Sequence, residues 1–142
     1  MINSEFSPEE LRAYGRALVL MASIDEAGVT ADEEQVIKRM LLDIGLDENA
    51  SGEVWSAPRS EQATLTELSR IQNDLLRRSL VKDLLMVAYA DGDFCSEEQA
   101  LLARLRAPLG IDNAFQRRAE DWVRRGIEWQ KDGLALCGLE VQ

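Results

Sequence analysis

Two short acidic segments hold the residue types that are best suited to chemistry in this chain. Asp25 lies seven residues beyond Leu18, and Asp91 lies seven beyond Leu84, which places each acid on the apolar side of an expected helix. Carboxylates gathered in this way repel one another unless a counter-charge joins them, and oxygen ligands suit hard cations such as Ca²⁺, Mg²⁺ or Mn²⁺. The candidate metal ligands are Asp25, Glu33, Asp91, Asp93 and Glu98.

The same acids also have a purely structural interpretation. Glu33 follows Thr30 by three residues, which is the spacing of a capping box at the start of a helix. Aspartates in turns commonly accept hydrogen bonds from loop N–H groups, and Gly92 suits a tight turn. An EF-hand is excluded, because the twelfth loop position counted from Asp91 is Leu102 rather than Glu. Metal ligation and structural capping therefore both stay open for these acids.

No catalytic constellation accompanies the acidic segments. The chain has no histidine, which removes the commonest general base and the usual partner of a Ser or Cys nucleophile. Its two cysteines, Cys95 and Cys137, fit no zinc spacing, and the acids around Cys95 are expected to raise the pKa of that thiol. We expect a protein that is not an enzyme and whose one candidate cofactor is a divalent cation.

The charge balance favours protein partners over nucleic acid. The formal net charge is −10, so a phosphate backbone would be repelled by most of the surface. One basic stripe near the C-terminus departs from this balance, with arginine pairs that recur seven residues apart. It is typical of a docking surface for an acidic partner, of a contact with the chain's own acidic loops, or of a solvated helix face. The residues of this stripe are Arg117, Arg118, Arg124 and Arg125.

Helices must position these residues, because apolar positions recur every three or four residues and no stretch alternates with period two. Capping boxes begin helices at Ser7 and Thr30, and Gly45 ends one. In the last helical region, spacing predicts a buried face made of Phe115, Ala119, Trp122, Gly126 and Trp129. We predict a single all-α domain over residues 1–142, a compact bundle of about six or seven helices.

No apolar run approaches the roughly 20 residues that span a bilayer, and the first residues do not resemble a signal peptide. We therefore expect a cytoplasmic protein that does not itself span a membrane.

The bundle is predicted to contain two similar helix–acidic-loop–helix units. Residues 18–25 match 84–91 at a constant offset, and the match continues beyond the loop with the offset reduced by one. Two such units can pack about a pseudo-twofold axis. Only the second loop contains Asp-Gly-Asp, so the Asp91 loop is the stronger candidate site. The predicted divisions are unit one at 10–47, a connector at 48–72, unit two at 74–112 and a C-terminal helical region at 113–137.

The repeated phrase resembles a known family signature. Residues 88–98, AYADGDFCSEE, followed by Leu101-Leu102 and 109–112, resemble the signature of the tellurite-resistance TerB family, and residues 21–33 resemble a weaker copy of it. The resemblance covers about residues 10–115. It implies the all-helical bundle of that family, an association with stress responses, often near membrane partners, and metal binding through acidic residues. Glu26 and Cys95 depart from the signature, which has Gly and Ser or Thr there.

Three functional hypotheses follow from these observations. The first is a non-catalytic TerB-like module of a bacterial stress response, acting through protein contacts, with a membrane-associated partner at the inner membrane and a divalent cation at the acidic loops. The second is an acidic immunity or antagonist protein that binds a basic target. The third, which the sequence favours least, is a metal-dependent enzyme.

Overall fold

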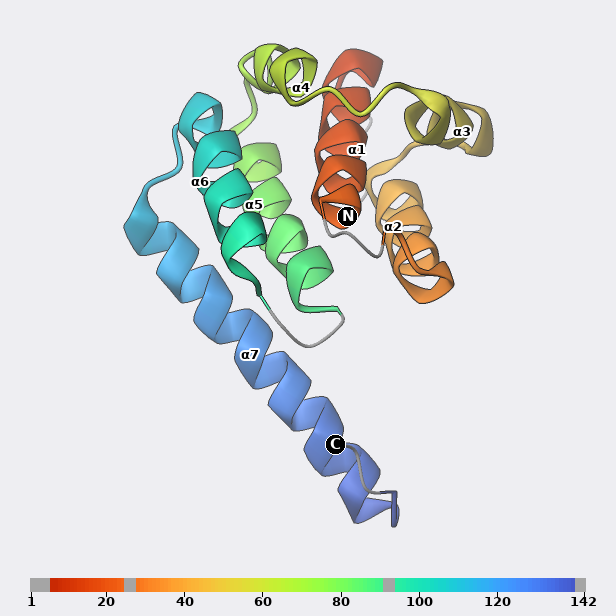
Figure 1. Cartoon of the computed structure of the whole chain (residues 1–142), viewed down its shortest axis with the longest axis vertical. Coiled ribbons are helices and arrows are strands. Elements are labelled where there is room, and N and C mark those ends of the chain that lie inside the picture. Colours follow the sequence, from red (N-terminus) through yellow and green to blue (C-terminus); the bar gives the residue numbers. More distant parts are fainter. Residues whose placement is uncertain (1–5, 25–27, 91–93, 140–142) are drawn as a thin grey trace.

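The computed structural model describes residues 6–24, 28–90 and 94–139, and every regular element in these ranges is a helix. The all-α prediction is therefore confirmed, and seven helices follow one another along the described chain (Figure 1). Their bounds are α1 (Pro8–Ser23), α2 (Ala31–Ile44), α3 (Glu48–Ser56), α4 (Glu61–Leu68), α5 (Asp74–Tyr89), α6 (Ser96–Leu109) and α7 (Asn113–Leu136).

The helix ends follow from local chemistry in the sequence. Ser7 and Thr30 cap α1 and α2, and in both boxes the glutamate three residues on accepts a hydrogen bond from the backbone N–H of the cap. Gly45 and Gly110 end α2 and α6 with positive φ angles of 109° and 67°, which glycine adopts without the steric cost that a side chain would bring.

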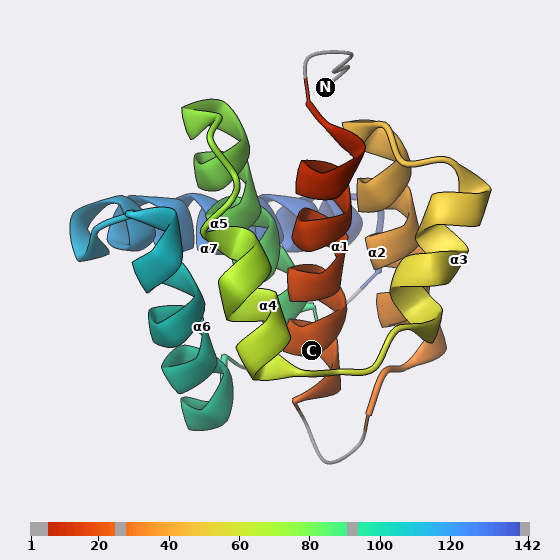
Figure 2. The same cartoon turned by 90° about the horizontal axis from the view of Figure 1, so that it is seen from above.

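Helices α1 and α5 form the centre of the bundle. Ten of the 16 residues of α1 are buried, because α1 packs against α2, α3, α4, α5 and α6. Seen from above, α2 and α3 lie on one side of this central pair and α6 on the other (Figure 2). Helix α1 contacts α6, and α5 contacts α2. A pseudo-twofold arrangement of the two units requires both contacts, because it exchanges α1 with α5 and α2 with α6.

The repeat extends to a third helix in each half. After each glycine stop, an aspartate caps the next helix: Asp47 caps α3, and Asp112 caps α7. Helix α3 then packs on α1, and α7 packs on α5. Val54 in α3 and Ala119 in α7 occupy equivalent positions and are both buried. The connector predicted at 48–72 thus contains the counterpart of α7, followed by the additional helix α4.

Helix α7 differs from the buried face predicted for it. The buried side chains are Ala119 and Val123, while Trp122 is 52% exposed and Trp129 is 76% exposed. Spacing of three and four residues fits several faces of one helix, and α5 covers the face of Ala119 and Val123. Helix α7 also has 24 residues, against nine in α3, and its C-terminal half projects beyond the bundle (Figure 1). The prediction that both tryptophans are core residues is therefore wrong.

The additional helix α4, in the segment predicted as a connector, ends at Leu68. Ile71 follows the end of the helix and is still fully buried, so its apolar character reflects the core rather than a continuing helix. Within the described part of the chain, no helix combines the length and the apolar content that a membrane span requires.

Candidate functional site

The two glutamates of the predicted metal site begin helices at equivalent positions in the two units. Glu33 accepts a hydrogen bond from the N–H of Thr30 at 3.1 Å, and Glu98 accepts one from the N–H of Cys95 at 2.9 Å. Both side chains are buried, with 8% and 6% exposure. The structural role assigned to Glu33 is confirmed, and Glu98 has the same role in the second unit.

The other three candidate ligands, Asp25, Asp91 and Asp93, lie outside the described residues. Across residues 6–24, 28–90 and 94–139, no three acidic or cysteine side chains are grouped so that they could hold a metal ion. A cation site at the loops therefore stays a prediction.

Cys95 sits at the start of α6 and is exposed. The backbone N–H of Glu98 lowers the pKa of its thiol, but hydrogen bonding to the Glu98 carboxylate, slight desolvation and the charge of Glu98 raise it by more. The net effect is a pKa above the ordinary value of 9.0, in the direction expected from the acidic surroundings.

A buried polar network that the sequence did not reveal joins α1 to α5. The hydroxyl of Tyr14, which is fully buried, donates to the carboxylate of Asp83. Because that proton goes to Asp83, the Ser79 hydroxyl at 2.9 Å donates to the Tyr14 oxygen. Lys82 Nζ lies 3.3 Å from the other carboxylate oxygen of Asp83. Burial and the negative charge of Asp83 raise the pKa of Tyr14 well above 10.0, so the phenol stays protonated.

This network exists on only one side of the pseudo-twofold axis. The positions in α1 equivalent to Ser79 and Asp83 are Ala13 and Ala17, and the position in α5 equivalent to Tyr14 is Leu80. These three residues are buried and apolar. The central helix pair therefore has a polar contact in one half and an apolar contact in the other.

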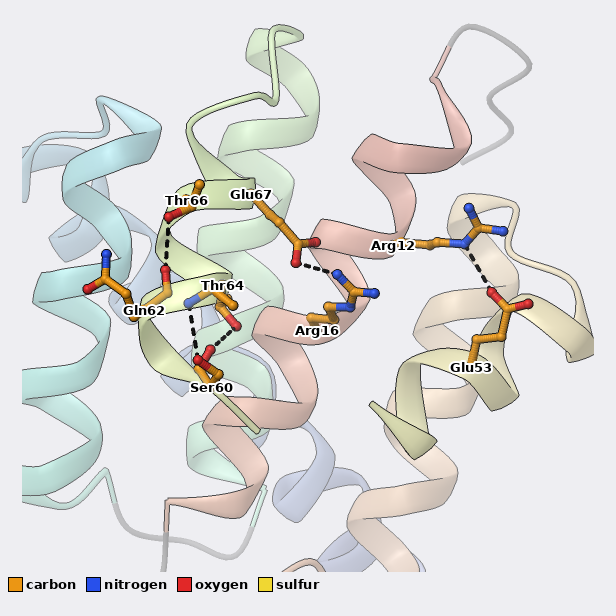
Figure 3. A network of polar contacts seen from close by, with 9 residues as sticks. Arg12, Arg16, Glu53, Ser60, Gln62, Thr64, Thr66 and Glu67 are labelled. Carbon is orange, nitrogen blue, oxygen red and sulfur yellow. Dashed lines mark hydrogen bonds and ion pairs between the residues drawn. The ribbon is translucent and has the colours of Figure 1, made fainter. Parts of the chain in front are cut away.

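Two ion pairs attach the peripheral helices to α1 (Figure 3). Arg12 Nε lies 3.3 Å from the Glu53 carboxylate of α3, and the Arg16 guanidinium donates to the Glu67 carboxylate of α4. Neighbouring turns of α1 therefore bind helices that lie on opposite sides of it. Three of these side chains, Arg12, Arg16 and Glu67, also line a depression of about 480 Å³ together with Glu9, Glu10 and Arg70. Acids and bases balance there, so this depression has no marked preference for ligand charge.

A second depression, the α5–α7 groove, has a different character. Its volume is about 440 Å³. Three cationic side chains and three large apolar ones line it. These are Arg78, Lys82 and Arg118, with Leu75, Phe115 and Trp122. The Arg118 guanidinium lies 5.6 Å from the ring centre of Phe115, and Lys82 Nζ lies 6.0 Å from that of Trp122.

The four arginines predicted as a docking stripe do not share one environment. Arg118 lines the α5–α7 groove, whereas Arg125 forms an ion pair with Asp121 at 3.0 Å. Arg124 lies close enough to Tyr89 to lower the pKa of that phenol, against the larger raising effects of burial and of Glu120. Arg117 is exposed. Sequence spacing found the stripe, but it could not find the residues of α5 that complete the groove.

The fold and its repeated capping boxes define a class of protein. It is an all-helical bundle of two repeated units, and each unit has an acidic segment of sequence between its first two helices. The model of a family described as Tellurite resistance protein TerB matches residues 17–121. This match spans well over half of the chain and includes most of unit one and all of unit two, so the chain belongs to the TerB family, and the resemblance of the sequence is confirmed. No curated protein and no solved structure matches the chain.

Proposed function

We propose that this protein is a non-catalytic TerB module of a bacterial stress-response pathway of the tellurite-resistance type, and that it works through contacts with protein partners. The observation that carries this proposal is the family match over residues 17–121, which includes the acidic segments of both repeated units. Its acidic charge and its lack of histidine support a binding role over a catalytic one. The family match also favours this function over that of an immunity protein with a basic target.

Deleting the gene is expected to lower tellurite tolerance in a bacterium that carries it. The measurement is the minimum inhibitory concentration of potassium tellurite for the deletion strain, with and without a plasmid copy of the gene. We expect a severalfold loss that the wild-type copy restores. Unchanged tolerance in the deletion strain, with the protein shown to be expressed in the parent, would contradict the proposal.

We further propose that the acidic loops hold a hard divalent cation. Asp25, Asp91 and Asp93 would supply oxygen ligands, with Glu33 and Glu98 at the edge of the site. The donor chemistry fits, because all five are carboxylates, and hard divalent cations prefer carboxylate oxygens as ligands. Such a cation would neutralise the repulsion between the loops, and its role would be structural or regulatory.

Chelator-treated protein is expected to give saturable calorimetric heat with at least one of Ca²⁺, Mg²⁺ and Mn²⁺. The Asp25→Asn/Asp91→Asn variant should lose this heat, because each substitution removes a charged oxygen ligand. Asp43→Asn/Asp132→Asn is the matched control, since it removes the same charge from exposed positions on α2 and α7. Absence of heat in the wild type, or equal heat in both double variants, would contradict a site at the loops.

A further inference from the structure

We propose that the α5–α7 groove binds an acidic amphipathic helix of a partner protein. This inference rests on the proposed function, in which the module acts through protein contacts, and it specifies the chemistry and the place of one such contact.

The first support is the charge of the groove. Arg78, Lys82 and Arg118 line it, and among the described residues no acidic side chain does. This is unusual in a chain with a net charge of −10. Lys82 is paired with the buried Asp83, so Arg78 and Arg118 supply most of the charge that a ligand would meet. Five of the 16 basic residues lie in α7 but only four of the 26 acidic ones, so the groove occurs where the surface is least acidic. Complementarity then requires an anionic occupant.

The second support is exposed apolar surface beside these cations. Leu75 is 54% exposed and Trp122 is 52% exposed, one on each wall of the groove. Large aromatic and aliphatic side chains in a concave, cation-lined site are typical anchors for a partner's apolar residues. The occupant must therefore present apolar side chains as well as carboxylates.

The third support is the length of the apolar row. Trp129 and Leu136 follow Trp122 at intervals of seven residues, so the three lie on nearly the same face of α7. Trp129 is 76% exposed and Leu136 is 89% exposed. Helix α7 is about 36 Å long at 1.5 Å per residue. Figure 1 shows that the C-terminal half of this helix extends beyond the bundle. An elongated occupant is needed to cover such a row, and a helix whose apolar residues recur every three or four positions fits it.

Two other occupants fit less well. In a second copy of this chain packed through the same row, Arg118 and Arg125 would face the like charges of the other copy. An anionic bilayer fits less well, because a flat surface cannot fill a concave site.

The test is a titration of the isotopically labelled full chain with two synthetic amphipathic helical peptides, followed by amide and indole chemical shifts. The peptides share one pattern of leucines and carry either glutamate or lysine at every polar position. We expect the glutamate peptide to shift the indole N–H of Trp122 and the amides of Leu75 and Arg78 saturably, and the lysine peptide to have no effect. Binding should weaken as salt is added.

Charge reversal decides between specific docking and general attraction. Arg78→Glu/Arg118→Glu should weaken binding of the glutamate peptide at least tenfold and create binding of the lysine peptide. Lys38→Glu/Arg39→Glu, at exposed positions of α2, reverses the same number of charges; it is the matched control and should leave both results unchanged. Trp122→Ala should weaken binding without reversing the charge preference. Thermal unfolding of each variant checks that the fold is intact.

The proposal is overturned if neither peptide binds saturably, if both bind equally, or if the reversed variant keeps the wild-type preference. It is also overturned if the chain floats with phosphatidylglycerol vesicles through Arg118, or if sedimentation shows a dimer that Arg118→Glu abolishes. Tellurite tolerance that depends on the gene but not on Arg78 and Arg118 would contradict this contact and leave the proposed function standing.

Discussion

Replacing Tyr14 by Phe is expected to lower the free energy of unfolding by about 1–3 kcal/mol near neutral pH, the cost of leaving a buried polar group unsatisfied. Tyr14 is fully buried, and its hydroxyl is held by Asp83 and Ser79. The substitution keeps the ring that fills the core but removes the donor to a buried carboxylate. Urea unfolding followed by circular dichroism at 222 nm measures the loss.

The same variant is expected to respond differently to alkaline pH. The pKa of Tyr14 in the folded chain is raised above 10.0, so its contribution to stability is complete below pH 10 and is lost as pH rises further, because the unfolded chain releases the proton first. The difference in the free energy of unfolding between wild type and Tyr14→Phe should therefore narrow as pH rises above 10.

Tyr89→Phe is the control for this experiment, since Tyr89 is only partly buried and its pKa is also raised, chiefly by burial. It should change stability little at neutral pH. A Tyr14→Phe variant as stable as the wild type, or a stability difference that does not change above pH 10, would show that the network contributes nothing.

Replacing Gly15 by Val is expected to destabilise the bundle by about 1–3 kcal/mol, as overpacking of a core usually does. A Cβ atom at Gly15 would lie 3.0 Å from Leu41 Cδ2 and 3.2 Å from Val54 Cγ1. These are side chains of α2 and α3, so Gly15 allows both helices to approach α1 closely. Urea unfolding again gives the measurement.

The second unit indicates how this loss can be reversed. At the positions equivalent to Gly15 and Val54 it has Val81 and Ala119, both buried, so the large and small residues are exchanged. Adding Val54→Ala to Gly15→Val should recover much of the lost stability. Gly126→Ala is the control, because nothing lies within 4 Å of a Cβ there, and it should be neutral or stabilising by up to about 1 kcal/mol. Additive losses in the double variant would contradict the exchange.

Much of the fold could be predicted from the sequence because its signals are local. The capping boxes at Ser7 and Thr30 and the stop glycines at Gly45 and Gly110 fix helix ends through chemistry within a few residues. The recurrence of apolar residues every three or four positions also predicted the all-α fold, which the helices of the described chain confirm. On α7 the periodicity failed, because which face is buried depends on where α5 lies, and spacing alone does not determine that for Trp122 and Trp129.

The candidate sites were harder to predict, because they need residues from different helices. The α5–α7 groove combines Arg118, found from its spacing, with Arg78 and Lys82, which only the packing of α5 on α7 brings near. The Tyr14 network did leave a signal: Asp83 stands between Leu80 and Val87 on an apolar stripe, where an ionisable group needs a partner. The sequence could not say that the partner is Tyr14.

The one-sided contact between Tyr14 and Asp83 also determines which halves can associate. Two copies of the first unit packed together would place Tyr14 against Ala13 and Ala17, with no partner for its hydroxyl. Two copies of the second would bury Asp83 against Leu80 with no phenol to donate. Each mispairing costs buried hydrogen bonds that the native pairing makes, much as a single polar core residue selects partners in a coiled coil. A bundle built from nearly interchangeable halves thereby distinguishes one half from the other.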